Sequence, residues 1–332
     1  MDAVEHLAGL QAQTPHSWYH GLWCRLATFD PGELAQLLLD RKVVRMALMR
    51  STIHLVSARD CRWLRPLVQP VIVRSMSGNF GKNLVGIDAD KLIAAGRELL
   101  EDRPMIFSEL GRALAERWPD HDPDSLAQAI RAWVPLVQVP PRGVWGRSGR
   151  PAHTTIESWL GTDVDPAPSV DQLVLRYLAA FGPASVKDAQ TWSGLTKLAE
   201  VFGRLDLIRF HAEDGRELFD LPDAPRPDPD IPAPPRFLYD FDNLLLSHAD
   251  RSRVATVEAA QQDYGTNIQP CMLLVDGFAK GQWKLTRTRG SAVLNIRPFL
   301  RLSKKDIAAI TAEGGRLLSF AAAGDSHDLR FS

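Results

Sequence analysis

The chain has 332 residues and a net charge of −1; 45% of its residues are hydrophobic and 24% charged, as in a globular protein of two or three domains. No apolar run reaches the ~18–20 residues that cross a bilayer, and no basic and apolar segments of a secretory signal open the sequence, so we predict neither a membrane span nor export. The three cysteines lie far apart, which argues against a disulfide framework or a zinc site and favours a reducing cytoplasm.

The first predicted element is a helix that contains VEHLAGLQAQ and ends near Thr14, because Pro15 disfavours the α conformation in the residue before it. Gln11 and Gln13 would lie at the end of this helix, where their amides can converge on one spot. An amide has no useful pKa near neutrality, but it can orient a water and present its dipole to positive charge. From these residues alone, helix capping or hydrogen bonding in the core is the more common role for two glutamines.

Two segments that follow share one order, helices and then a hairpin. Residues 31–58 predict a helix that ends near Arg41 and strands around residues 49–57. The next segment predicts three helices before a connection rich in glycine and arginine, with the helices at 88–104, 107–119 and 122–140 and the connection at 141–156.

The third segment shows this order most clearly. Residues 169–182 predict an amphipathic helix, residues 183–194 a short helix, and residues 195–210 a further helix that runs into a strand. Asp214-Gly215 then predicts the turn of a hairpin between short strands. Three helices followed by a hairpin is the order of a winged helix, a variant of the helix-turn-helix. We therefore predict an α+β protein with three tandem winged-helix motifs, the first of them incomplete at its N-terminus. A generic α+β scaffold is the alternative that the pattern leaves open.

The C-terminal part begins after a segment with six prolines, residues 223–236, which predicts an extended linker. Beyond it, strands that break at Asp276-Gly277 and Arg289-Gly290, followed by a closing helix, predict a small β-barrel or a curled sheet. The predicted domains are winged helices at 1–86, 87–165 and 166–222, the linker at 223–236 and the barrel-like unit at 237–332.

Charge is unevenly distributed along the chain. Residues 41–82 hold nine basic side chains and one acid, and residues 277–305 hold eight basic side chains and no acid, whereas residues 88–124 hold ten acids and five bases. A single basic run is usually a solvated helix face. Two such runs in a neutral protein favour an anionic polymer as partner.

Other candidates for chemistry have simpler interpretations. The set Asp240, Asp242, His248 and Asp250 contains possible metal ligands, but turn formation and pairing with neighbouring arginines are the more common roles for such residues. His121, Asp122 and Asp124 are expected to cap the helix that follows them. Cys24 has no evident activating base and is expected to be packed in the interior.

Three blocks carry a resemblance to a known family: LQAQTPHSWYHGLWCRL, VVRMALMRSTIHLVSARD and LLLSHADRSRV. They occur in the order of the AlkZ/YcaQ family of winged-helix DNA glycosylases, which the chain resembles over essentially its whole length. The resemblance implies three winged helices, a C-terminal β-barrel and excision of N7-alkylated purines from double-stranded DNA, including bulky adducts and, in some members, interstrand crosslinks. The family signature is Gln-apolar-Gln in AlkZ-like members and Gln-apolar-Asp in YcaQ-like members.

Gln11-Ala12-Gln13 matches the AlkZ-like signature, so the resemblance implies that Gln11 and Gln13 are catalytic. Alkylation at N7 makes the purine cationic, so the base leaves without protonation, and two neutral amides suffice to place a water and stabilise an oxocarbenium-like sugar. No lysine stands beside them to form a Schiff base, which predicts a monofunctional enzyme. We expect no cofactor and no metal.

The predicted DNA contacts are Arg41, Arg45, Arg50, Thr52, His54 and Arg147. For His54, a buried structural histidine is the alternative. We expect a monomer associated with the nucleoid in the cytoplasm. A DNA-binding regulator without catalysis is the main alternative function, and a protein that sequesters a drug is a weaker one. Family members carry about one more helix-turn unit before the glutamines, so we expect the natural chain to begin upstream or the first winged helix to be trimmed.

Overall fold

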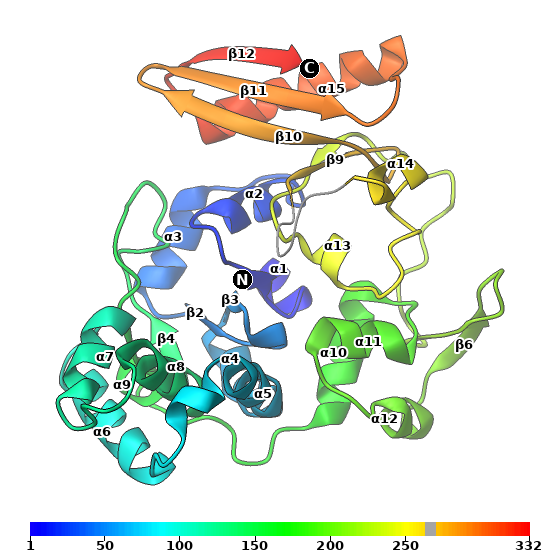
Figure 1. Cartoon of the computed structure of the whole chain (residues 1–332). Helices are drawn as coiled ribbons and strands as arrows, with labels where there is room; N and C mark the ends of the chain where they lie inside the picture. Colours follow the sequence, from blue (N-terminus) through cyan, green and yellow to red (C-terminus); the bar gives the residue numbers. More distant parts are fainter. Residues whose placement is uncertain (263–269) are drawn as a thin grey trace. The chain divides into compact units, whose positions relative to one another are not determined.

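The computed structural model describes residues 1–262 and 270–332 of the chain, which is a mixture of helices and strands (Figure 1). Contacts divide it into two compact units. The first unit comprises residues Met1–His16 and Asp30–Ala224, and the second comprises Ser17–Phe29 and Pro225–Ser332.

A five-stranded antiparallel sheet organises the first unit, with the strand order β1-β3-β2-β4-β5. All five residues of the central strand β2 are buried, as expected of a strand covered on both faces. The strands are β1 (Leu10–Gln11), β2 (Val43–Ala47), β3 (Ile53–Ser57), β4 (Leu136–Gln138) and β5 (His153–Thr155).

The first of three repeating arrangements contains β1, β2 and β3. Helix α1 (Asp2–His6) precedes β1, and α3 (Pro31–Leu39) precedes β2, with Asp30 capping α3 through the backbone N–H of Gly32. The predicted helix through Gln11 is therefore wrong: the helix ends at His6, and Gln11 lies in a strand.

The second arrangement repeats this order with three helices. Asp122 accepts from the backbone N–H of Ser125 and so caps the third helix, as predicted. Met105, between the first two helices, forms a bridge with His153 of β5 in the same way that β1 pairs with β3. The helices are α6 (Ala89–Asp102), α7 (Phe107–Ala115) and α8 (Pro123–Trp133).

The third arrangement has the same pairing once more. Ala184, after the first helix, bridges Phe219 in the second strand of a hairpin whose turn contains Gly215 at a φ of 82°, which confirms the predicted hairpin. Its elements are α10 (Val170–Phe181), α11 (Val186–Ser193), α12 (Ala199–Arg204), β6 (Ile208–His211) and β7 (Glu217–Asp220).

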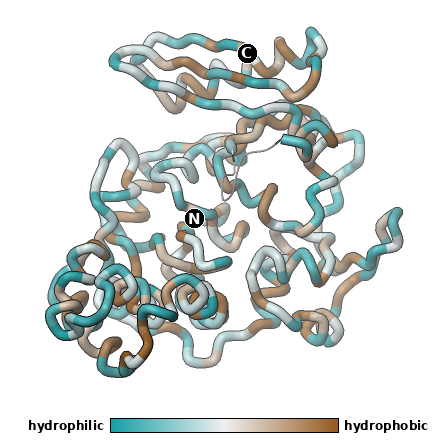
Figure 2. Tube along the Cα trace, in the orientation of Figure 1, coloured by the Kyte–Doolittle hydropathy of each residue, from teal (hydrophilic) through white to brown (hydrophobic). Residues whose placement is uncertain are grey.

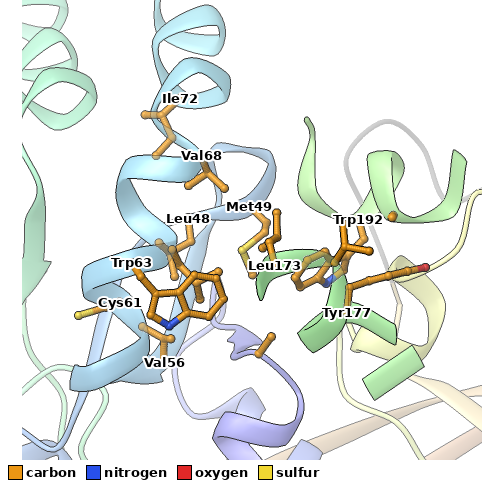
Figure 3. Close-up of a cluster of buried hydrophobic side chains, with 14 of the residues drawn as sticks. Leu48, Met49, Val56, Cys61, Trp63, Val68, Ile72, Leu173, Tyr177 and Trp192 are labelled. Atoms are coloured by element: carbon orange, nitrogen blue, oxygen red, sulfur yellow. The ribbon is translucent and has the colours of Figure 1, made fainter. Parts of the chain in front are cut away.

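One hydrophobic core connects the three arrangements. It includes Met49 from the β2–β3 connection, Leu173 from α10 and Trp192 from α11, which appear in the same cluster in Figure 3. Ala132 of α8 belongs to it as well. The remaining helical elements of the first unit are α4 (Ala58–Leu67), α5 (Gln69–Phe80), η2 (Gly81–Leu84) and α9 (Ile156–Leu160).

The second unit is built on an open five-stranded sheet with the order β12-β11-β10-β9-β8. Buried and accessible residues alternate along β10 and β11, and hydropathy varies along the same strands (Figure 2). Helix α15 supplies Ile310 and Leu317 to the core formed with β11. The strands are β8 (Arg236–Phe237), β9 (Met272–Val275), β10 (Phe278–Thr288), β11 (Ser291–Pro298) and β12 (Ser326–Phe331).

The predicted breaks at Asp276-Gly277 and Arg289-Gly290 are confirmed, because they separate β9, β10 and β11. The strands do not close: within the described residues, β12 and β8 remain the edges of the sheet, so no barrel is observed. The helices of this unit are α2 (Ser17–Trp23), α13 (Asn243–Leu246), α14 (Val257–Ala260) and α15 (Lys304–Ala321). None of the described helices combines the length and the apolar character that crossing a bilayer requires.

Candidate active site

Pairing with β3 places the two glutamines. Gln11 lies opposite His54 in the β1–β3 register, and the backbone N–H of Ala12 donates to the carbonyl of Ile53 at 2.7 Å. Gln13 extends this edge, and its Oε1 accepts from the backbone N–H of Ile53 at 2.9 Å. Both side chains are thus positioned by the hairpin of β2 and β3, and neither caps a helix.

The two glutamines differ in burial. Gln11 is only 3% exposed, whereas Gln13 is exposed. The Oε1 atom of Gln11 accepts from Nη2 of Arg50 at 2.8 Å. Both anchors, the guanidinium of Arg50 and the backbone N–H of Ile53, can only donate a hydrogen bond. The oxygen of each amide must therefore face its anchor, Arg50 for Gln11 and Ile53 for Gln13. Each Oε1 keeps a second lone pair, and each Nε2 carries two donors, which is the inventory needed to hold a water.

The β2–β3 connection, η1 (Met49–Ser51), holds Arg50 in place. Arg50 and Ser51 have φ values of 55° and 60°, in the left-handed region. Nη1 of Arg50 donates to the carbonyl of Trp192 at the end of α11, at 2.5 Å. On the other side, Nη2 of Arg131 in α8 donates to the carbonyl of Ser51 at 2.7 Å. Side chains and carbonyls from all three arrangements therefore meet at this turn.

His54 is a buried structural histidine, which was the alternative expectation. It is 2% exposed, and its Nδ1 donates to the carbonyl of Thr52 at 3.0 Å. Burial, followed by the positive charge of Arg50, lowers the pKa of His54 to about 3. The ring is therefore neutral at physiological pH and offers no charge to a phosphate, so the prediction of His54 as a DNA contact is corrected.

The predicted contact Arg45 is also placed differently from the expectation. It is 1% exposed and donates through Nη2 to the carbonyl of Ala12 at 2.9 Å, so it supports the backbone between the glutamines. A guanidinium buried in this way does not reach a phosphate at the surface. Its position in the fully buried strand β2 is the physical reason.

The remaining predicted contacts lie nearer the surface. Arg41 is exposed; its guanidinium stacks over the ring of Trp159 at 4.2 Å and donates to that residue's carbonyl. Thr52 is half-buried and donates to the carbonyl of Met49. Arg147 is exposed in the connection between β4 and β5.

That connection also reaches the glutamine segment. The ring of His16 donates through Nε2 to the carbonyl of Val144 at 2.9 Å and makes an edge contact with Trp145 at 6.0 Å between ring centroids. Burial is the main cause that lowers the pKa of His16. Sequence reasoning missed His16 and Arg131, because their partners lie 128 and 80 residues away and no local pattern marks them.

The candidate metal ligands of the second unit have other partners. Asp242 accepts from both terminal nitrogens of Arg25, at 2.9 and 2.6 Å, and from the backbone N–H of Leu244 in α13. Over the described ranges, no three His, Cys, Asp or Glu residues are arranged to hold a metal ion. Cys24 is buried as expected, and burial raises the pKa of its thiol to about 11.

Comparisons with known proteins agree with this fold. The family model described as "DNA glycosylase AlkZ-like" matches residues 4–320. Among solved structures, Streptomyces sahachiroi DNA glycosylase AlkZ is similar with a TM-score of 0.79 and 20% sequence identity, and the match covers 100% of this chain and 93% of that chain. At this identity the structural likeness concerns the fold alone. Comparison with curated proteins finds no match.

Proposed function

We propose that this chain, which belongs to the AlkZ-like family and is a DNA glycosylase, hydrolyses the N-glycosidic bond of N7-alkylated purines in double-stranded DNA. The substrates in this proposal include bulky adducts and interstrand crosslinks, and the enzyme acts as a monomer on DNA in the cytoplasm. The anchored pair Gln11 and Gln13 is the observation that carries it.

The chemistry needs little from the protein. As the C1′–N9 bond breaks, its electron pair moves to N9 and neutralises the cationic purine, so no general acid is required. The oxygen of a water then bonds to C1′, and its proton passes to solvent. Amides held rigidly by a backbone N–H and a guanidinium can place that water and stabilise the sugar cation without reorganising. Gln13, which is exposed, is the member of the pair that meets the lesion first.

The three repeated arrangements support the DNA-binding part of the proposal. We infer that each is a winged helix, because in each a short segment before the last helices pairs with the second strand of the hairpin. Arg41 and Arg147, which are exposed, are the proposed phosphate contacts, whereas Arg45 and His54 act inside the fold.

Single-turnover excision of N7-methylguanine from a duplex, in buffer with EDTA, tests this function. We expect Gln13→Ala to slow excision by about ten- to a thousandfold, as loss of a transition-state stabiliser does, with DNA affinity nearly unchanged. Gln13→Asp should keep part of the activity, since a carboxylate can orient the same water.

A matched control is Gln36→Ala, because Gln36 is an exposed glutamine whose amide donates to Asp40 on the surface of α3. This variant should excise at the wild-type rate. If the wild-type protein leaves N7-methylguanine in place, or if Gln11→Ala and Gln13→Ala both excise normally, the proposed substrate or mechanism is wrong.

A further inference from the structure

The turn that carries Arg50 has an unusual choice of residues. The N–H of Thr52 donates to the carbonyl of Met49 at 3.1 Å, and the two residues between them, Arg50 and Ser51, both have positive φ. This is the backbone of a type I′ turn, for which Asn-Gly is the favoured pair because side chains with a Cβ are strained there. Strain of this kind persists where the surroundings hold it and is often associated with a functional site.

The side chain of Arg50 supplies a reason for the strain. Its two terminal nitrogens donate to different acceptors, Nη1 to the carbonyl of Trp192 and Nη2 to Oε1 of Gln11. The planar guanidinium thereby fixes Oε1 of Gln11 relative to the carbonyl oxygen of Trp192. Trp192 is itself held in place, because the residue is only 3% exposed and its ring packs on Tyr177 with centroids 5.1 Å apart.

The backbone of the same turn is also held by a residue of the second arrangement. Arg131 donates to both the carbonyl and the hydroxyl oxygen of Ser51, at 2.7 and 3.3 Å. The turn therefore cannot move without breaking contacts to α8 or to α11. Since Oε1 of Gln11 is fixed by Arg50, the Nε2 of the same planar amide is fixed as well.

These contacts differ from what a phosphate contact requires. Sequence reasoning placed Arg50 among the DNA contacts, but both of its terminal nitrogens donate to acceptors inside the first unit. We infer that Arg50 is a positioning residue, which orients the carboxamide of Gln11 for excision and connects it to the third arrangement. This inference rests on the proposed function.

Three variants and a control test it. Arg50→Gly deletes the guanidinium while relieving the positive φ, so the turn is retained. Arg50→Lys keeps the charge but lacks the fork that reaches two acceptors. We expect both to slow single-turnover excision at least about tenfold, with the slope of log affinity against log salt unchanged.

Adding Arg50→Gly to Gln11→Ala should slow excision by less than about twofold more, because Arg50 acts through Gln11. The control is Arg316→Ala, which removes an exposed arginine of α15 that pairs with Glu313, and it should leave both the excision rate and the salt slope unchanged.

A second readout does not depend on activity. In NMR relaxation, the side-chain amide of Gln11 should be rigid in the wild-type protein and in Arg316→Ala, and mobile in Arg50→Gly. If the wild-type protein does not excise the lesion while Arg50→Gly releases this amide, the proposed function fails and the positioning role stands. If Arg50→Gly leaves the amide rigid or excises at the wild-type rate, the inference is overturned. Restoration of the rate by Arg50→Lys, with a lower salt slope in Arg50→Gly, would also overturn it and assign Arg50 to phosphate.

Discussion

Two hairpins of this molecule turn with similar backbone geometry but with different residues. Between β9 and β10, Asp276 and Gly277 have φ values of 53° and 76°, and Asp-Gly is a favoured pair for such a turn. Between β2 and β3, Arg50 and Ser51 have φ values of 55° and 60°, although neither residue favours this conformation. The first turn has residues suited to its backbone, and the second has residues whose side chains make distant contacts.

The difference shows where residues serve long-range contacts and not the conformation of their own turn. Asp276 is exposed, so the turn needs only its own conformational preference. Arg50 and Ser51 instead connect Gln11, Trp192 and Arg131. A strained residue costs about 1–3 kcal/mol, and a net hydrogen bond contributes about 0.5–1.5 kcal/mol. The four bonds at this turn, about 2–6 kcal/mol together, are of the same size as the strain of two such residues.

The largest expected effect comes from giving the β2–β3 turn the favoured pair. The double substitution Arg50→Asn, Ser51→Gly should relieve the backbone but remove the contact with Gln11. We expect single-turnover excision to fall by about a hundredfold, or about 2.7 kcal/mol of activation free energy, while the melting temperature changes little. Excision at the wild-type rate would mean that the two turns differ in residue choice without a functional reason.

Strand β3, which follows the β2–β3 turn, contains the buried His54, and this residue should make the stability of the protein sensitive to acid. The folded chain keeps His54 neutral down to a pKa of about 3, whereas the unfolded chain takes up this proton below about 6.5. The free energy of unfolding therefore decreases as the pH falls through that interval, by about 2 kcal/mol at pH 5 from this group. In His54→Asn, whose amide can still donate to Thr52, urea unfolding at pH 7, 6 and 5 should show a loss about 2 kcal/mol smaller. An equal loss in both proteins would remove His54 as the cause.

A smaller effect is expected at the β9–β10 turn, which has the favoured Asp-Gly pair. Gly277→Ala adds a Cβ at a φ of 76° and should destabilise the protein by about 1 kcal/mol. The control is Gly315→Ala, within α15, where an added Cβ meets nothing within 4 Å and should stabilise by up to about 1 kcal/mol. Denaturant unfolding measures both, and effects of the same sign would contradict the conformational argument.

The smallest effect is expected from Arg147, which is exposed, whereas Arg50 of the β2–β3 turn makes its contacts inside the first unit. Arg147 lies in the connection between β4 and β5 and is exposed. Loss of one phosphate contact in Arg147→Ala should weaken DNA binding a few-fold and lower the salt slope by about one, equally for all sequences. Fluorescence anisotropy at several salt concentrations measures this. An unchanged slope would show that Arg147 does not contact phosphate.

Local patterns explain what could be foreseen from the sequence. The Asp276-Gly277 turn, the cap at Asp122 and the hairpin at Asp214-Gly215 depend on residues close in the chain, and they are found where they were expected. The repeated order is matched only in part, because β4 lies within the predicted helix 122–140 and β2 precedes the strands predicted around residues 49–57. The strand at Gln11 was not foreseen, because β1 has only two residues and takes its conformation from pairing with β3. Tertiary pairing outweighed local propensity there.

The site was foreseen only in part. The two glutamines were singled out by a resemblance, and their roles stay a prediction. The burial of Arg45 was not visible in a basic run, since charge patterns do not tell which arginines enter a sheet. Nor could sequence spacing pair Arg50 with Trp192, which lies 142 residues further on.

That separation has a consequence for biosynthesis. Gln11 leaves the ribosome before Trp192, whose carbonyl anchors Arg50, the partner of Gln11. At about 5–20 residues per second, translation from Arg50 to Trp192, which is 142 positions further on, takes roughly seven to thirty seconds. During that time the nascent chain lacks α11. The contacts that hold the side chain of Gln11 are therefore completed only when the third arrangement emerges. A ribosome stalled before that point carries the glutamines without their final support.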